Sequence, residues 1–173
     1  NYVRYLYIYK NVLEMKTIQT EMRRIDIMKE KLKFFAANGK ERTVYTVTEI
    51  GADEYKIQIT IEPNRLRPDI PEFDESLDLG RKQKLAVDIE FLDAGLKVLN
   101  LELKCKNDLS KKYTYYVKND VPGQRTVKKF DLADCDYEVR RNAGQIVLAT
   151  FPTDFSDMNM LSAEFILHGI TFE

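Results

Sequence analysis

The spacing of apolar residues changes once along this chain, near Asn38 and Gly39. Before that point, residues 2–37 contain no Pro or Gly, and apolar side chains recur every three or four positions, as on one face of an α-helix. After it, apolar and polar residues alternate, which is the period of a β-strand. The change predicts two parts: an N-terminal amphipathic helix over residues 1–39 and a β-rich domain over residues 40–173.

The predicted helix carries a row of apolar residues at heptad spacing. The row consists of Met15, Ile18, Met22, Ile25 and Leu32, with Lys29 also on it. A heptad row is typical of a coiled coil, and roughly 36 helical residues at ~1.5 Å each would outreach a small sandwich. We therefore expect self-association, or contact with a parent protein, through this row. The alternative is that the row packs on the β-rich domain.

Eight segments of the second part alternate as strands do. They are residues 43–50, 55–61, 84–92, 96–104, 113–118, 126–132, 145–151 and 161–172. Turn residues such as Gly51-Ala52-Asp53 separate them, and intervals of about ten residues are typical of an antiparallel sandwich or barrel. A Pro-containing loop over residues 63–80 is expected to cross from one sheet to the other.

The charge balance limits the partners of the chain. Lys and Arg number 27 against 28 Asp and Glu, a net charge of −1, so nothing attracts a phosphate backbone and we expect no nucleic acid partner. The apolar runs are far shorter than the ~20 residues that cross a bilayer, so we expect no membrane span. Because the chain does not begin with Met, we interpret it as a fragment or a processed product.

No catalytic pattern stands out. His168 is the only histidine, so any Ser-His-Asp or Cys-His arrangement would have to use it. It alternates with Ile166 and Ile170 on the last predicted strand, and we interpret it as a packed or edge histidine. Phosphate-loop, dinucleotide and zinc-protease motifs are absent. We therefore predict a protein that is not an enzyme and that has no cofactor.

Two acidic clusters are candidates for calcium ligands or for a catalytic carboxylate pair. They are Glu72, Asp74, Glu75 and Asp78 in one case, and Asp131, Asp134 and Asp136 in the other. Neither has a diagnostic spacing, so we interpret both as solvated loop charges and predict no metal site. Cys105 and Cys135 lack a CxxC spacing, and the sequence leaves open whether they form one bridge or two core thiols.

Three tyrosines of one predicted strand are candidate ligand-binding residues. Tyr113, Tyr115 and Tyr116 place rings on both faces of that strand and are flanked by lysines. An exposed tyrosine beside a lysine can stack on a sugar ring or cover an interface, whereas the alternative is ordinary packing between strands. We predict that these three tyrosines bind a ligand.

Four segments carry a family resemblance. They are the strand 113–117, the turn Val121-Pro122-Gly123-Gln124, the strand ending Phe130-Asp131-Leu132, and the closing strand 163–172. Their order resembles galactose-binding-like jelly-roll modules, a group that contains many carbohydrate-binding modules. The resemblance covers roughly residues 80–173.

The resemblance implies a mainly β fold, a jelly-roll-like antiparallel sandwich of about eight strands, here preceded by the long α-helix. It also implies recognition of a glycan or polysaccharide, and similar modules occur in bacterial surface-glycan assembly. We expect a non-catalytic binding module carried on a helical oligomerisation or linker segment. The alternative is a structural or assembly protein whose sandwich and helix mediate protein–protein contacts.

Overall fold

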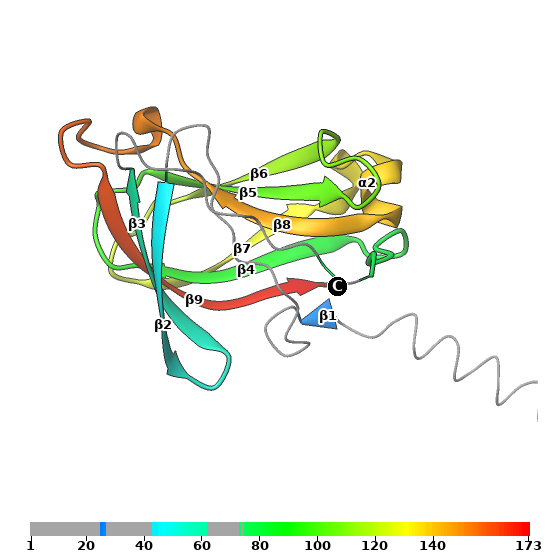
Figure 1. Cartoon of the computed structure of the whole chain (residues 1–173). Helices are drawn as coiled ribbons and strands as arrows, with labels where there is room; N and C mark the ends of the chain where they lie inside the picture. The colour runs from blue at the N-terminus through cyan, green and yellow to red at the C-terminus, as the bar shows by residue number, and fades with distance from the viewer. Residues whose placement is uncertain (1–24, 27–42, 62–72, 74) are drawn as a thin grey trace, which may run out of the picture.

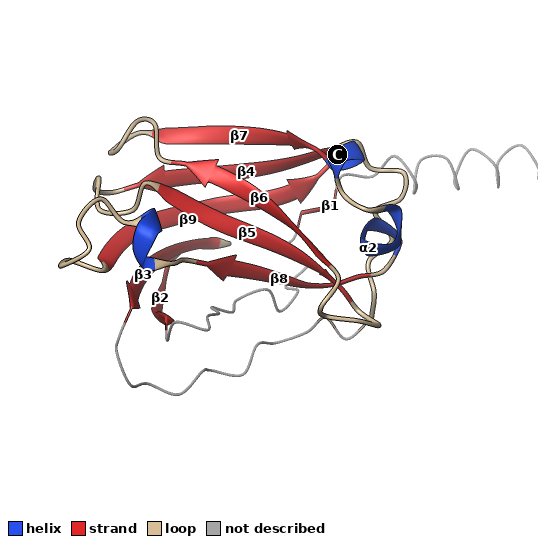
Figure 2. Ribbon diagram, turned by 90° about the horizontal axis from the view of Figure 1, so that it is seen from above, coloured by secondary structure: helices blue, strands red, loops and turns tan. Residues whose placement is uncertain are grey.

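The computed structural model describes residues 25–26, 43–61, 73 and 75–173. Within these residues the chain forms two antiparallel β-sheets that pack face to face (Figure 1). All eight predicted strands are present, so the mainly β, antiparallel fold is confirmed. Figure 2 shows the two layers and the short helical turns at their ends.

The two sheets differ in size. The larger has the order β2 (Thr43–Gly51), β3 (Glu54–Ile61), β9 (Ser162–Phe172), β4 (Lys84–Phe91) and β7 (Arg125–Asp131), and β1 (Ile25–Asp26) pairs with β9. The smaller has the order β6 (Lys112–Lys118), β5 (Val98–Cys105) and β8 (Ala143–Ala149). Because both sheets have alternating strands, each can turn an apolar face toward the other.

The core lies between the sheets. Ile57, Leu85 and Phe165 reach it from the larger sheet, and Leu101 and Ile146 reach it from the smaller, and all five are fully buried. The opposite face of the larger sheet is polar: on β7, exposed residues alternate with partly buried ones along the whole strand. For the larger sheet, one buried and one solvent-exposed face is the arrangement that the period of two predicts.

β9 is the central strand of the larger sheet and carries a β-bulge. Leu167 pairs with Ile89 and Gly169 pairs with Asp88, so His168 is the extra residue of β9. A bulge lets two successive side chains share one side of a strand. The core positions therefore jump by three residues at this point, from Leu167 to Ile170, instead of by two.

β8 is buried on both faces along its whole length. Leu77 forms a β-bridge with Ala143, and the backbone N–H of Phe73 donates to the Gly144 carbonyl at 2.7 Å. A Cβ on Gly144 would lie 2.4 Å from the Cα of Lys106, so only glycine fits there. The edge of the smaller sheet at β8 is therefore covered by the chain itself.

Three short helical turns interrupt the loops. They are the 3-10 turns η1 (Leu132–Asp134) and η2 (Pro152–Asp154) and the α-helix α2 (Tyr137–Arg141). Each turn is too short to show a helical period of apolar residues, so the sequence pattern does not distinguish these turns from loops. Arg140 of α2 donates to the carbonyls of Gly80 and Lys82 at 2.9 and 3.3 Å, which joins this turn to the segment before β4.

Two expectations about the chain path were wrong. At Ile25 and Asp26 the structure has a strand where a helix was predicted, because β3 pairs with β9 only as far as Leu167 and leaves the last residues of β9 free to pair with β1. The loop after β3 does not change sheets, because β3 and β4 lie on opposite sides of β9 in one sheet.

The rest of the predicted helix, including Met15, Ile18, Met22, Lys29 and Leu32, lies outside the described residues. The proposed boundary between residues 39 and 40 lies there as well. Among the described residues, no helix has the length and apolar character of a membrane span.

Candidate functional site

The three candidate tyrosines of β6 lie on different sides of the smaller sheet. Tyr116 is 59% exposed, whereas Tyr115 is only 3% exposed. Tyr113 is half-buried and packs against the core. Of the three, Tyr116 is the one whose ring is open to a ligand in solution.

Tyr115 is part of the core. Its ring centroid lies 4.9 Å from that of Tyr113 and 5.5 Å from that of Phe130. Burial raises the pKa of the Tyr115 hydroxyl well above its usual range, and the Cys135 thiol beside it adds to the shift. A ring held in this way stabilises the sandwich and does not reach a ligand outside it. Tyr115 therefore has no exposed ring surface for the ligand contact that the sequence predicts.

Tyr116 shares its face of the smaller sheet with a second exposed aromatic ring. Tyr116 pairs with Asn100 of β5, and Asn100 pairs with Ala149 of β8. Beyond Ala149 the chain stays extended, and Thr150 is fully buried, so the alternation turns Phe151 to the same side as Ala149. Phe151 is 39% exposed. Two aromatic rings thus border one face, about two strand spacings apart, or ~10 Å.

A buried polar contact fixes the chain between these rings. The amide nitrogen of Asn100 donates to the Ala149 carbonyl at 3.1 Å and to Oδ2 of Asp154 at 2.7 Å. The same oxygen accepts from the backbone N–H of Phe151 at 2.8 Å. Because Asn100 is 3% exposed, this network is shielded from water and holds Phe151 in a defined place.

A buried carboxylate lies one residue pair further along the same face. Glu102 pairs with Thr114 and has a side chain that is only 4% exposed. Lys112 forms an ion pair with Glu102 Oε1, and the Lys104 ammonium lies 3.6 Å from Oε2. Two cations thus compensate a buried charge, as such a charge requires. This charged cluster lies at the end of the face that is farther from Phe151.

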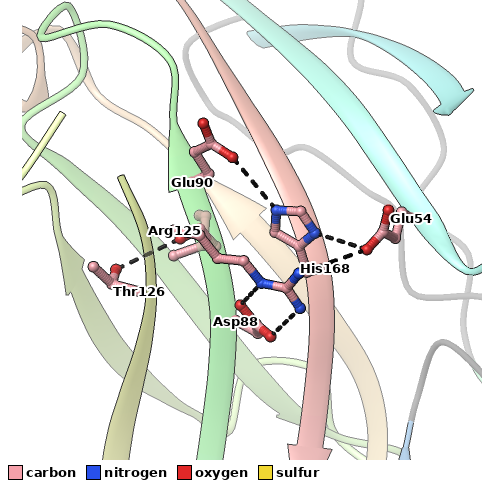
Figure 3. Close-up of polar contacts among 7 residues, drawn as sticks. Glu54, Asp88, Glu90, Arg125, Thr126 and His168 are labelled. Atoms are coloured by element: carbon pink, nitrogen blue, oxygen red, sulfur yellow. Dashed lines mark hydrogen bonds and ion pairs between the residues drawn. The ribbon is translucent and has the colours of Figure 1, made fainter. Parts of the chain in front are cut away.

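A separate polar cluster surrounds His168 on the outer face of the larger sheet (Figure 3). The His168 Nδ1 lies 2.9 Å from Oε1 of Glu54, and its Nε2 lies 3.7 Å from Oε2 of Glu90. An ionised carboxylate only accepts, so the ring N–H donates to Glu54. The imidazole side chain is 9% exposed, and its Nε2 makes no hydrogen bond within the described chain.

Arg125 completes this cluster. Its guanidinium donates through Nε and Nη2 to the two carboxylate oxygens of Asp88, at 2.9 and 2.8 Å. Its Nη1 lies 3.9 Å from Oε1 of Glu54. The hydrogen bonds to Asp88 are the main cause of a raised pKa of Arg125. A bidentate pair of this kind fixes the orientation of both side chains.

Within the described part of the chain, His168 contacts carboxylates and has no Ser or Cys nucleophile as a partner. The partners of the imidazole are carboxylates from β3 and β4, and an acyl-transfer triad needs a Ser or Cys at hydrogen-bond distance. The geometry agrees with the interpretation of His168 as a packed histidine with satisfied Nδ1.

One member of each acidic cluster forms an ordinary ion pair in the described chain. Asp131 lies 2.5 Å from the Lys84 ammonium, and Asp78 lies 3.2 Å from the Arg141 guanidinium. No group of three or more His, Cys, Asp or Glu side chains in the described ranges is arranged to hold a metal ion. Glu72 and Asp74 lie outside those ranges.

The two cysteines are free and buried, which answers the question that the sequence left open. Burial raises the pKa of the Cys135 thiol to about 11. A thiol with such a pKa is almost fully protonated at neutral pH, so it is a poor nucleophile.

Sequence reasoning missed most of the polar partners. Glu54, Glu90 and Arg125 come from three separate strands, and nothing in their spacing joins them to His168. Asn100 and Phe151 were missed because each lies in an apolar strand context. The one available signal was the spacing of three between Leu167 and Ile170, which marks a bulge at His168.

The sequence matches no family model and no curated protein. Among solved structures, it is similar to a carbohydrate-binding module described as specific for non-crystalline cellulose, CBM28, at 13% sequence identity. The match covers 82% of this chain and 75% of that one, with a TM-score of 0.28.

Proposed function

We propose that this chain is a non-catalytic, jelly-roll-like module that binds a glycan or polysaccharide at Tyr116, on the outer side of its smaller sheet. The observation that carries the proposal is the exposed ring of Tyr116, which shares that face with the exposed ring of Phe151. Sugar rings present apolar C–H faces, and an aromatic ring that is held rigidly can stack on them.

The surroundings of Tyr116 suit a polar ligand. Lys118 lies two residues along the same strand and is exposed, so its ammonium is on the same side. Thr114 lies two residues in the other direction and supplies a hydroxyl. Tyr113 and Tyr115 face inward and, in this proposal, support the strand that presents Tyr116.

The N-terminal part of the proposal concerns residues that the structure does not describe. The heptad spacing of Met15, Ile18 and Met22, which precede β1, supports a helical linker or oligomerisation segment there, whereas Leu32 follows β1. Ile25 is no longer part of that row, since it pairs with β9.

The binding proposal is tested by a glycan array, followed by calorimetry with a soluble glycan that scores positive. We expect Tyr116→Ala to weaken binding about 5- to 30-fold, since stacking on an aromatic ring contributes ~1–2 kcal/mol. The matched control is Tyr137→Ala, because Tyr137 is 61% exposed but lies on α2.

Two results would contradict the proposal. If no glycan binds the wild-type chain, the function is wrong. If Tyr116→Ala binds a glycan as tightly as the wild type does, the site is wrong even though the function holds.

A further inference from the structure

The outer side of β6 presents a row of cationic, aromatic and hydroxyl side chains. Alternate residues of a strand point to the same side, and those that lie between the members of this row face the core. The row consists of Lys112, Thr114, Tyr116 and Lys118. At ~3.3 Å per residue it is about 20 Å long. Tyr116 therefore lies between two lysines of its own strand.

Lys118 is an exposed cation beside the Tyr116 ring. Among the ion pairs of the described chain, none includes Lys118. Asp120, which follows it by two residues, forms its ion pair with Lys128 at 2.7 Å. The hydrogen bond from Lys128 is the main cause of a lowered pKa of Asp120, and Lys118 contributes the least. The charge of Lys118 is therefore available to an anion in solution.

Lys112 exposes a second ammonium group at the other end of the row. Its side chain is 43% exposed, whereas the Glu102 carboxylate with which it pairs is only 4% exposed. Lys104 also approaches that carboxylate, at 3.6 Å. Two ammonium groups on one carboxylate leave a positive charge in excess. A ligand from solution thus meets the cation of this cluster and not its anion.

The carboxylates on this side of the smaller sheet are engaged with the protein itself. Glu102 is bound by its two lysines. Asp154 accepts through Oδ2 from the Asn100 amide and from the backbone N–H of Phe151, at 2.7 and 2.8 Å. Neither carboxylate therefore offsets the exposed lysines that flank Tyr116.

We propose that the glycan bound at Tyr116 is an acidic polysaccharide, whose anionic groups pair with Lys118 and Lys112 while a sugar ring stacks on Tyr116. This inference rests on the proposed function and adds the charge of the ligand. An uncharged chain would gain only the stacking contact, whereas a chain with repeated acidic groups matches cations on both sides of the ring. An ammonium group is a compact point charge, so it accepts a carboxylate or a sulfate.

The experiment compares charged polymers with uncharged polymers of the same backbone, by calorimetry on the full chain. One pair is polygalacturonate and its methyl-esterified form, and the other is dextran sulfate and dextran. The two pairs distinguish a carboxylate from a sulfate as the anionic group. In at least one pair we expect the charged polymer to bind about fivefold or more tightly at low salt. This preference should shrink as salt is added, because exposed ion pairs are screened.

A charge reversal tests the place of the contact. Lys118→Glu should weaken binding of the charged polymer about tenfold, because it replaces an attraction with a repulsion. The matched control is Lys129→Glu, which changes the net charge equally. Lys129 has a side chain that is 58% exposed and lies on β7, in the other sheet, so its substitution should leave binding unchanged. Lys118→Gln is the second variant if circular dichroism shows that Lys118→Glu does not fold.

Three results would overturn the inference. If neutral glycans bind as tightly as both charged polymers, the ligand is not acidic, although the proposed function stands. If Lys118→Glu and Lys129→Glu weaken binding equally, the charge does not act beside Tyr116. If no polymer and no array glycan binds the wild-type chain, the proposed function fails and this inference fails with it.

Discussion

The Nδ1 atom of His168 lies 2.9 Å from Oε1 of Glu54, which joins the bulge of β9 to the first residue of β3. On this side of β9, pairing with β3 ends at Leu167 and pairing with β1 begins at Thr171. The contact therefore holds the β2–β3 hairpin where the hydrogen-bond ladder is interrupted, and this role leads to the first prediction.

His168→Ala should lower the free energy of unfolding by about 1–3 kcal/mol, because it leaves Glu54 without its ring partner and opens a space above the sheet. Urea unfolding measures this change. Gln58→Ala is the control, because Gln58 is exposed on the same face of β3 and should change stability by no more than ~0.5 kcal/mol. Equal effects of the two substitutions would show that the imidazole does not hold the hairpin.

The Arg125–Asp88 pair should contribute little despite its bidentate geometry. The Arg125 side chain is 53% exposed, so water and salt screen its charge. We expect Asp88→Asn to cost less than ~1 kcal/mol at low salt and less still at high salt. Unfolding measured at two ionic strengths tests this, and a larger cost that is independent of salt would contradict it.

Replacement by alanine should destabilise the fold much more at Gly144 than at Gly169. A Cβ on Gly144 would lie 2.4 Å from the backbone of Lys106, whereas a Cβ on Gly169 meets only the Asp88 Cβ, at 3.9 Å. We expect Gly144→Ala to cost about 3 kcal/mol or more, because β8 would have to separate from its neighbour. Gly169→Ala should change stability by less than ~1 kcal/mol. Thermal unfolding of both variants measures the difference, and similar melting temperatures would contradict it.

The Cys135 thiol should make stability depend on alkaline pH. Its pKa is about 11 in the folded chain, against an ordinary value of 9.0. Between these values the unfolded chain has lost the thiol proton and the folded chain has kept it, so the free energy of unfolding falls as the pH rises. The contribution is complete below about pH 9, and its loss amounts to on the order of 2 kcal/mol by about pH 11.

Urea unfolding at several pH values in this range tests the prediction against Cys135→Ala, which should lose this part of the slope. Other groups also titrate at alkaline pH, so the relevant quantity is the difference between the two proteins. Identical slopes would mean that the Cys135 thiol is as accessible to solvent as in the unfolded chain.

The strands could be predicted from the sequence because each has one face in the core. Thr126–Leu132, for example, was predicted one residue from its position in the structure. The faces of β6 could not be predicted as easily, because Tyr115 and Tyr116 are adjacent and both are aromatic. Only the neighbouring strands decide which ring is buried: Tyr115 lies beside Leu101 of β5 and contacts Phe130 of the opposite sheet.

The long-range partners were beyond the sequence for a different reason. The contact between Glu54 and His168 joins residues that are 114 positions apart, and no local period reports on it. The path of the chain after β3 could not be predicted for the same reason. β3 and β4 lie in one sheet because β9, which is far from both in the sequence, pairs with both of them.

β9 ends one residue before the C-terminus, yet β3 and β4 both depend on it as their shared neighbour. During synthesis β3 can pair only with β2, and β4 only with β7, until residues 162–172 have left the ribosome. Deletion of residues 162–172 would therefore separate the β2–β3 pair from the β4–β7 pair and would not merely shorten the larger sheet.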